Sequence, residues 1–447
     1  MYNILIVEDE LSWSRSMERN LRDVLTLHNL QSMASWQVVV DTGSAINQIR
    51  SCPWTVACFD LRLPADIGGS ISTAAGNQLI SRRDIARSLM KRFCYSATLS
   101  MDSADSEMLG TGSVLPEADR TTGPKLEKYG KASSDLVAPN GLDWEFLSTY
   151  GWAKRVVEFL SSDKLQTEHV ASGRISKTAV GFWLERAPRA LPPVLARHAQ
   201  DLANAWDESG STKTDVAIRL IETAACLALG QTLVLLAQPS PMQTPQAAAW
   251  PTDGLHASML NALDDLLTCH TAQLSKWNWS GWMTPATLSA MRAAHAIRNE
   301  KSHSKQRVNA RDEWQTLLPH LRVVMDLCGY WALHPLCADL RYDHNGWRAQ
   351  LLASTAWPAP MEPLDRDHDF PSDAATDHDH FWQCVGYRER PDQPWVLKGI
   401  GWGEVLVRDQ RDTDTGLRIW RQVAPNGEHR SWVRLSLMTG KLVSGRH

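Results

Sequence analysis

The sequence predicts a multidomain protein in which an α/β doubly wound unit is followed by an all-α helical bundle and then by a small antiparallel β module. Strand and helix signals alternate in the first part of the chain, helical periodicity fills the middle, and short apolar runs divided by turn signals fill the end. With 447 residues the chain is also too long for one ordinary core, so several domains are expected.

The α/β unit is expected over residues 1–162. Its apolar runs predict strands at 3–8, 38–40, 55–60 and 93–96, with a weaker segment at 126–132. Helices are predicted for Leu11 to His28, Ala45–Arg50, a segment from Gly76, and Leu142 to Leu160. This alternation is the βαβ pattern of a parallel sheet. Polar loops at 65–75 and 110–123 lengthen the connections.

The helical domain is expected over residues 163–340. Candidate helices cover 191–206, 213–237, 255–276, 285–300 and 311–331. They are separated by prolines and by a glycine turn, at Pro239, Pro241, Pro245, Pro251 and Gly281.

Residues 341–447 are expected to form a linker and a tryptophan-rich β module. The acidic segment from Asp365 to His380 predicts an exposed linker or long loop, and metal binding by its histidines is a weaker alternative. Short strands divided by turn signals are predicted at 395–398, 405–407, 417–420 and 432–435. Core packing is the favoured role for the late tryptophans, among the 20 in the chain.

Composition excludes some functional classes. A net charge of -4 argues against a protein that coats nucleic acid through its overall field. The eight cysteines are scattered without metal-like spacing, which is typical of reduced, buried thiols. The apolar stretch from Val216 to Ala237 contains Arg219 and Glu222, so it predicts a buried helix and no membrane association. With no secretory signal at the amino terminus, we expect a cytoplasmic location.

Three carboxylates follow apolar strand runs in the first sixty residues. Glu8 and Asp9 end the first run, and Asp60 ends the run at 56–59. Since ligands gather beyond the carboxyl ends of parallel strands, we expect the three side chains to meet at one edge of the sheet. Hard oxygen ligands suit Mg²⁺, and a carboxylate such as Asp60 can form an acyl phosphate. The alternative is that the three acids only cap strand ends.

The amino-terminal unit resembles the two-component response-regulator receiver family, through ILIVEDE at 4–10, FDLRLP at 59–64 and YSA at 95–97. The resemblance implies a flavodoxin-like fold with Asp60 as phospho-acceptor. It also implies a histidine kinase or phosphotransfer protein as partner. The implied Mg²⁺ ligands are Glu8, Asp9, Asp60 and the backbone carbonyl of Arg62.

The same resemblance implies two further groups beside the phosphoryl group. Ser96 would be the switch hydroxyl, and a lysine, Lys131 or alternatively Lys128, would supply positive charge. The family's lysine-proline dipeptide is absent here. Enlarged loops at 65–75 and 103–124 also depart from the family pattern.

A second motif lies in the helical domain, where Arg298-Asn299 is followed by His303. It resembles the Arg-x4-His motif of HEPN domains. The resemblance implies a homodimer whose paired motifs form a metal-independent RNA-cleaving cleft, with Asn299 as the polar residue after the arginine. His303 would act as general acid or base, and Arg298 would stabilise charge on the scissile phosphate. His295, on the same helix, is a weaker candidate for lining the cleft.

Helical geometry constrains this motif. Five residues along an α-helix correspond to about 140° of rotation, so either the helix ends near Ser302 or the site is composite across a dimer. The surrounding segment is basic, which favours a polyanion, although a solvated basic helix end is the simpler alternative. Its cations, set against Glu300 alone, are Arg292, Arg298, Lys301, Lys305, Arg307 and Arg311.

Together these motifs predict a phosphorelay response regulator that controls a HEPN-like ribonuclease, with a toxin-like or phage-defence role by family analogy. The alternative is a non-enzymatic regulator, transcriptional or adaptor, whose helical and β domains bind protein or nucleic acid. The enzyme needs both Arg298 and His303, and the adaptor needs neither.

Overall fold

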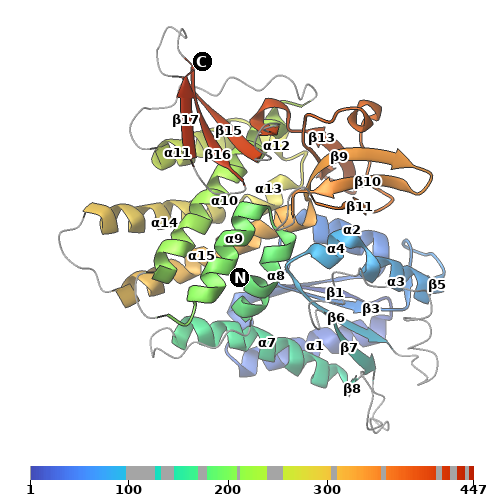
Figure 1. Ribbon diagram of the computed structural model, residues 1–447. Coiled ribbons are helices and arrows are strands. Elements are labelled where there is room, and N and C mark those ends of the chain that lie inside the picture. Colours follow the sequence, from blue (N-terminus) through green and yellow to red (C-terminus); the bar gives the residue numbers. More distant parts are fainter. Residues whose placement is uncertain are drawn as a thin grey trace. The chain divides into compact units, whose positions relative to one another are not determined.

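The computed structural model describes residues 2–96, 126–131, 145–169, 179–208, 212–238, 255–303, 310–353, 359–408, 415–422, 430–437 and 442–446. The chain divides into two compact units, and Figure 1 labels their elements. The first unit comprises Met1–Glu168 and Ser176–Phe182. The second comprises His169–Ile175 and Trp183–His447, so the helical and late β regions lie in one unit.

The first unit contains a six-stranded parallel sheet with the order β2-β1-β3-β6-β7-β8. The predicted parallel α/β architecture is therefore confirmed. Its strands are β1 (Tyr2–Val7), β2 (Ala34–Val39), β3 (Val56–Asp60), β6 (Lys91–Ser96), β7 (Leu126–Lys131) and β8 (Glu145–Leu147). The expectation of a helix from Leu142 was wrong at its start, because 145–147 form β8.

Helices cover both faces of this sheet, as the alternation of side chains along each strand requires. Ile4 and Ile6 of β1 face a core shared with α1 and α7, whereas the equally buried Leu5 and Val7 face the other side, where α2 contacts β1 and α3 contacts β3. The helices are α1 (Leu11–Leu27), α2 (Thr42–Ser51), α3 (Thr73–Ser81), α4 (Arg83–Arg87) and α7 (Thr149–His169).

The long loop after β3 is more ordered than its polar sequence predicts. It contains a small antiparallel pair, β4 (Leu63–Pro64) with β5 (Ile71–Ser72), and α3 follows directly. The loop is fastened to the start of α2, since the Thr42 hydroxyl and the Gly43 amide both donate to the Ala65 carbonyl oxygen, at 2.8 and 3.1 Å. The other expected loop, 110–123, lies outside the described residues, as does most of the insertion at 103–124.

The helical region of the second unit is built around α10 (Thr212–Leu236), which contacts α9, α11, α14 and α15. In its most apolar window 89% of the residues are buried, which is the pattern of a core helix. It is the one helix among the described residues with the length and hydropathy of a membrane span. The other helices are α8 (Ala179–Ala190), α9 (Pro193–Ala205), α11 (Leu255–Cys269), α12 (Thr271–Leu274), α13 (Trp279–Trp282), α14 (Pro285–His303) and α15 (Ala310–Leu333).

Two antiparallel sheets follow, of which the first was largely unforeseen. It has five strands in the order β11-β10-β9-β12-β13, and the second has four in the order β14-β15-β16-β17. The first comprises β9 (Leu336–Asp343), β10 (Gly346–Leu351), β11 (Met361–Pro363), β12 (Trp382–Tyr387) and β13 (Val396–Gly401). The second comprises β14 (Leu406–Arg408), β15 (Thr415–Gln422), β16 (Arg430–Ser436) and β17 (Leu442–Arg446).

The segment from Asp365 to His380 is the long loop that its composition predicts, but it is not exposed throughout. His368, Phe370 and Ala374 are all buried, and Phe370 and Ala374 pack into the hydrophobic core of the five-stranded sheet. Three apolar or aromatic anchors therefore hold an otherwise polar loop against the sheet.

Buried hydrogen bonds join the helices of the second unit to the same sheet. The His334 ring contacts Asn278 through Nε2 at 2.7 Å and the Cys384 carbonyl oxygen through Nδ1 at 2.9 Å. Because a carbonyl only accepts, Nδ1 carries the proton and Nε2 accepts from the Asn278 amide. The Gly386 amide donates to Asn278 at 3.2 Å, and a Cβ at Gly386 would lie 2.8 Å from Asn278.

Candidate functional site

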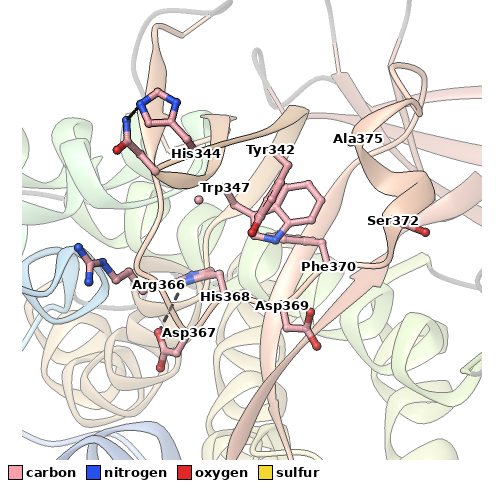
Figure 2. Close-up of a pocket in the computed structure, with 12 residues that line it drawn as sticks. Tyr342, His344, Trp347, Arg366, Asp367, His368, Asp369, Phe370, Ser372 and Ala375 are labelled. Atoms are coloured by element: carbon pink, nitrogen blue, oxygen red, sulfur yellow. Dashed lines mark hydrogen bonds and ion pairs between the residues drawn. The ribbon is translucent and has the colours of Figure 1, made fainter.

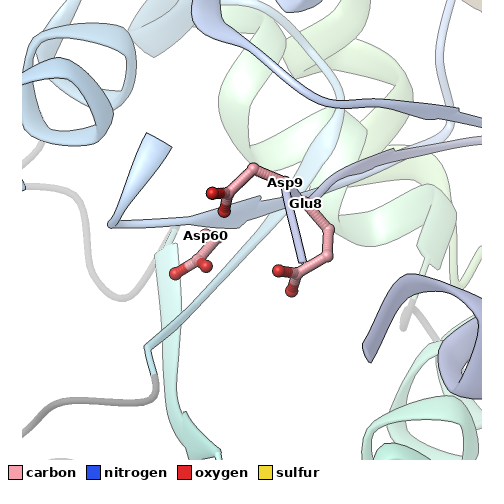
Figure 3. Close-up of side chains that lie close together, drawn as sticks. All are labelled: Glu8, Asp9 and Asp60. Carbon is pink, nitrogen blue, oxygen red and sulfur yellow. The ribbon is translucent and has the colours of Figure 1, made fainter. Parts of the chain in front are cut away.

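Three carboxylates converge where β1 and β3 end (Figure 3). Glu8 and Asp9 follow β1 directly, and Asp60 is the last residue of β3, its parallel neighbour. One oxygen atom from each side chain lies within 4.8 Å of the others. Glu8 is fully buried, Asp60 is 3% exposed, and Asp9 is half-buried. The structure thus brings together the three acids that the sequence singled out.

Burial of like charges at this distance is costly. Two carboxylates that share a site disfavour each other's ionised form, and burial adds to that cost. A divalent cation bound between them offsets the repulsion, and an all-oxygen donor set suits hard cations such as Mg²⁺. The donor chemistry of Glu8, Asp9 and Asp60 therefore fits a divalent metal ion.

Main-chain amides hold two of the carboxylates in place. The Arg62 amide donates to Asp60 Oδ1 at 3.2 Å, and the Glu10 amide donates to Glu8 Oε1 at 3.1 Å. Arg62, whose carbonyl the receiver resemblance implies as a further ligand, thus contacts the Asp60 carboxylate through its backbone. These bonds fix the acids at the edge of the sheet before any ligand arrives.

The backbone after Asp60 is held by contacts on two sides. The Leu61 amide donates to the Tyr95 carbonyl oxygen at 3.1 Å. On the other side α3 approaches so closely that a Cβ built on Gly76 would lie 2.1 Å from the Leu61 carbonyl oxygen. Glycine is therefore required at position 76 for this helix to reach the loop that follows Asp60.

Tyr95 is a site residue that the sequence analysis missed. It lies beside Asp60 in the parallel register of β3 and β6, and it is 3% exposed. Its hydroxyl reaches past β3 and donates to the Val7 carbonyl oxygen at 3.2 Å. Burial, the charges of Glu8 and Asp60, and a hydrogen bond with Glu8 raise the pKa of Tyr95 well above its ordinary value. The phenol therefore keeps its proton and serves as a donor beside the acids.

The remaining residues implied by the receiver resemblance lie on adjacent strands. Ser96 ends β6 and is paired in register with Gly130 of β7. Lys131 is the last residue of β7, at the carboxyl end of its strand, whereas Lys128 lies within the strand opposite Cys94. Position along the strand therefore favours Lys131 over Lys128. The side chains of these residues lie outside the described part of the structure.

The second motif lies within a continuous helix. α14 is described as far as His303, so its described end lies next to Ser302, and both alternatives for the motif stay predictions. Positions 298 and 303 are then about 140° apart around one helix axis. A site that uses both Arg298 and His303 therefore needs either a change of direction at this helix end or a composite arrangement across a dimer.

The basic segment of α14 is paired with carboxylates from neighbouring helices. Arg298 binds Glu222 at 2.8 Å, and Lys301 binds Asp215 at 2.5 Å and lies 3.7 Å from Glu313. Arg292 binds Asp264 at 2.7 Å, so each cation of this segment whose side chain is described has an acidic partner. This pairing is what a structural helix surface shows.

Asn299 and His295, both on α14, contact each other at 3.0 Å. Burial, together with the charge of Arg298, lowers the pKa of His295. The histidine is therefore held in its neutral form on the helix that carries the motif.

Comparisons with known proteins give no relative from which a function could be inferred. No family model, curated protein or solved structure matches the chain.

Proposed function

We propose that the first unit is a receiver-type phosphorylation domain in which Asp60 accepts a phosphoryl group. The observation that carries the proposal is the convergence of Glu8, Asp9 and Asp60 within 4.8 Å at the carboxyl ends of two neighbouring parallel strands. Ligands of open α/β sheets bind at this edge.

The strand order supports the proposal. Numbered along the chain, the first five strands of the parallel sheet follow the order 2-1-3-4-5, which is the order of the flavodoxin-like fold. The acids lie where that order reverses, between β1 and β3. In this topology the reversal point is the place where the crevice for a ligand opens. β8 adds a sixth strand at the far edge of the sheet.

The chemistry assigned to the site is a phosphoryl transfer. An Asp60 carboxylate oxygen forms a bond to phosphorus, and the bond between phosphorus and the donor's nitrogen or oxygen breaks, its electron pair leaving with the donor. A divalent cation such as Mg²⁺ supplies neutralisation of the phosphoryl oxygens when bound. Glu8 and Asp9 would hold that ion, and Ser96 and Lys131 would contact the phosphoryl group. A histidine kinase or phosphotransfer protein is the proposed donor.

For the output of the second unit, the contacts of Arg298 favour the non-enzymatic alternative. Its guanidinium is 2.8 Å from Glu222, so stabilisation of a scissile phosphate would require that pair to break. We therefore propose that the second unit acts as a binding or adaptor region. The HEPN-like ribonuclease, its homodimer and its RNA substrate stay predictions.

Phosphorylation of the full chain tests the proposal. Incubation with acetyl phosphate and Mg²⁺ should add one phosphoryl group per chain, measured by intact mass, and a chelator should prevent it. Asp60→Asn should abolish the addition because the nucleophilic oxygen is replaced. Asp66→Asn, in the loop after β3, is the matched control and should be phosphorylated like the wild type. Equal incorporation in Asp60→Asn and the wild type would exclude Asp60 as the acceptor.

A further inference from the structure

The five-stranded sheet of the second unit has an open groove beside the turn that joins β9 and β10 (Figure 2). Its volume is about 1100 Å³, and its other wall is the loop that follows Leu364. Aromatic side chains line its centre and polar side chains line its margin. The aromatic residues are Tyr342, Trp347 and Phe370.

The three rings form one continuous surface. Tyr342 and Trp347 are directly opposite each other on β9 and β10, and their ring centroids are 5.1 Å apart in an edge-to-face arrangement. Trp347 meets Phe370 in the same way at 5.2 Å. Trp347 also packs against the core of the sheet, so the surface has a fixed base. Tyr342, by contrast, is 67% exposed, so the outer ring of this surface is accessible to a ligand.

The opposite wall is also held in place. The buried His368 ring stacks on Phe370, and its Nδ1 donates to the Asp365 carbonyl oxygen at 3.0 Å. The Gly399 amide of β13 donates to the Asp369 carbonyl oxygen at 2.6 Å. A Cβ on Gly399 would lie 2.7 Å from that oxygen, so the loop lies directly on the strand. Both walls of the groove are therefore formed before a ligand binds.

The polar margin determines the class of ligand. Arg366 supplies hydrogen-bond donors, whereas the carboxylates of Asp367 and Asp369 only accept. A nucleic acid is disfavoured, because two carboxylates and one arginine do not attract a polyanion. A simple cation is disfavoured by Arg366. Donors and acceptors beside an aromatic surface suit a neutral ligand whose hydroxyl groups both donate and accept.

We propose that this groove binds a neutral oligosaccharide. Sugar rings present apolar C–H faces that pack on aromatic rings, and their hydroxyl groups match the mixed polar margin. Tyr342 and Trp347 form the platform, and Arg366, Asp367 and Asp369 bind the hydroxyl groups. The groove uses no residue of the acidic cluster, so the sugar-binding proposal is independent of the phosphorylation proposal.

Titration calorimetry of the full chain with maltohexaose, cellohexaose and chitohexaose tests the proposal. At least one of these neutral oligosaccharides should bind, and Tyr342→Ala should weaken that binding by about tenfold or more. Tyr342 is mostly exposed, so its replacement should leave the fold intact. Tyr150→Ala removes another exposed tyrosine, on α7, and should bind like the wild type.

A second variant, Asp369→Asn, separates the polar margin from the aromatic platform. It keeps the backbone bond to Gly399 and should weaken binding through loss of the charged acceptor. The proposal is overturned if none of the three sugars binds at millimolar concentration, or if Tyr342→Ala binds as tightly as the wild type. It is equally overturned if hexauridylate binds in a Tyr342-dependent manner and the sugars do not.

Discussion

The acidic cluster of the first unit and the basic segment of α14 in the second unit arrange charge in opposite ways. At the cluster, Glu8, Asp9 and Asp60 bring the same sign of charge within 4.8 Å, and two of the three are buried. Along α14, each cation with a described side chain faces a carboxylate from another helix, as Arg298 faces Glu222.

This difference distinguishes the proposed ligand site from a structural contact. Buried like charges raise the free energy of the ion-free protein, and a bound cation lowers it again. Opposite charges in contact already satisfy each other, so a ligand would first have to displace one of them. Both motifs are candidate sites in the sequence, and the partners of their charged side chains distinguish them.

The largest effect is expected from deforming the edge on which the acids lie. Gly76→Ala places a Cβ 2.1 Å from the Leu61 carbonyl oxygen, so α3 or the loop after Asp60 must move. We expect a loss of about 3 kcal/mol in the free energy of unfolding, measured by urea denaturation. Mg²⁺-dependent phosphorylation of Asp60 should fall as well.

Ala74→Ser, at an exposed position of α3, is the control for Gly76→Ala and should change neither property. A Gly76→Ala variant as stable as the wild type would show that α3 does not lie as close to Leu61 as described.

A smaller effect is expected from Tyr95→Phe, which removes the buried donor beside the acids. Loss of the bond to the Val7 carbonyl should cost about 1 kcal/mol at neutral pH, measured by urea denaturation. Mg²⁺ affinity should fall several-fold because Glu8 loses a hydrogen-bond partner. Tyr387→Phe, in the second unit, is a control that should leave Mg²⁺ affinity unchanged.

The pH dependence of Tyr95 has a definite sign. Its pKa is raised in the folded protein, so the folded state binds this proton more tightly than the unfolded chain. The resulting stability is complete below about pH 10, the ordinary pKa of tyrosine, and is lost as pH rises through the folded-state pKa. Above about pH 10 the wild type should therefore lose stability more steeply than Tyr95→Phe. Parallel curves for the two proteins would contradict the role assigned to the phenol.

The parallel sheet and its acids were predictable from the sequence because both faces of that sheet are buried. Its strands β1 and β3 then read as apolar runs, and the acids end those two runs. Tyr95 was not predictable in the same way. Its hydroxyl reaches the end of β1 only because β3 and β6 are neighbours in the sheet, and strand order is a property of the fold.

The late β region was harder to predict for a different reason. β9 begins at Leu336, and only His334 and Pro335 separate it from the end of α15 at Leu333, so no polar loop marks the change from helix to strand. In the segment from Asp365 to His380, polar residues conceal the few anchors, such as Phe370, that bind it to the sheet. The composition of this segment is dominated by its polar residues, whereas its position is determined by the few side chains that are buried.

Neutralising one acid in each region should change stability in opposite directions. Asp9→Asn removes a like charge and should raise the free energy of unfolding by about 0.5–1 kcal/mol without metal, while abolishing stabilisation by Mg²⁺. Asp264→Asn removes the partner of Arg292 and should lower it by up to about 0.5 kcal/mol. Thermal denaturation with and without Mg²⁺ measures both. A stability change of the same sign in the two variants would contradict the distinction between repelling charges in the acidic cluster and paired charges along α14.

The smallest effect is expected when Arg298 itself is removed. If its role is the ion pair with Glu222, then Arg298→Ala should cost about 0.5 kcal/mol, since the guanidinium is 43% exposed, and should leave cellular RNA intact. The ribonuclease prediction requires the reverse: RNA degraded by the wild type with its kinase active, and protected in both Arg298→Ala and His303→Ala. RNA integrity after expression of the three proteins distinguishes the two outcomes. Arg292→Ala, which breaks the pair with Asp264 on the same helix, controls for a general loss of charge. RNA cleavage by the wild type that only Arg298→Ala and His303→Ala abolish would place a catalytic site on α14 despite its paired charges.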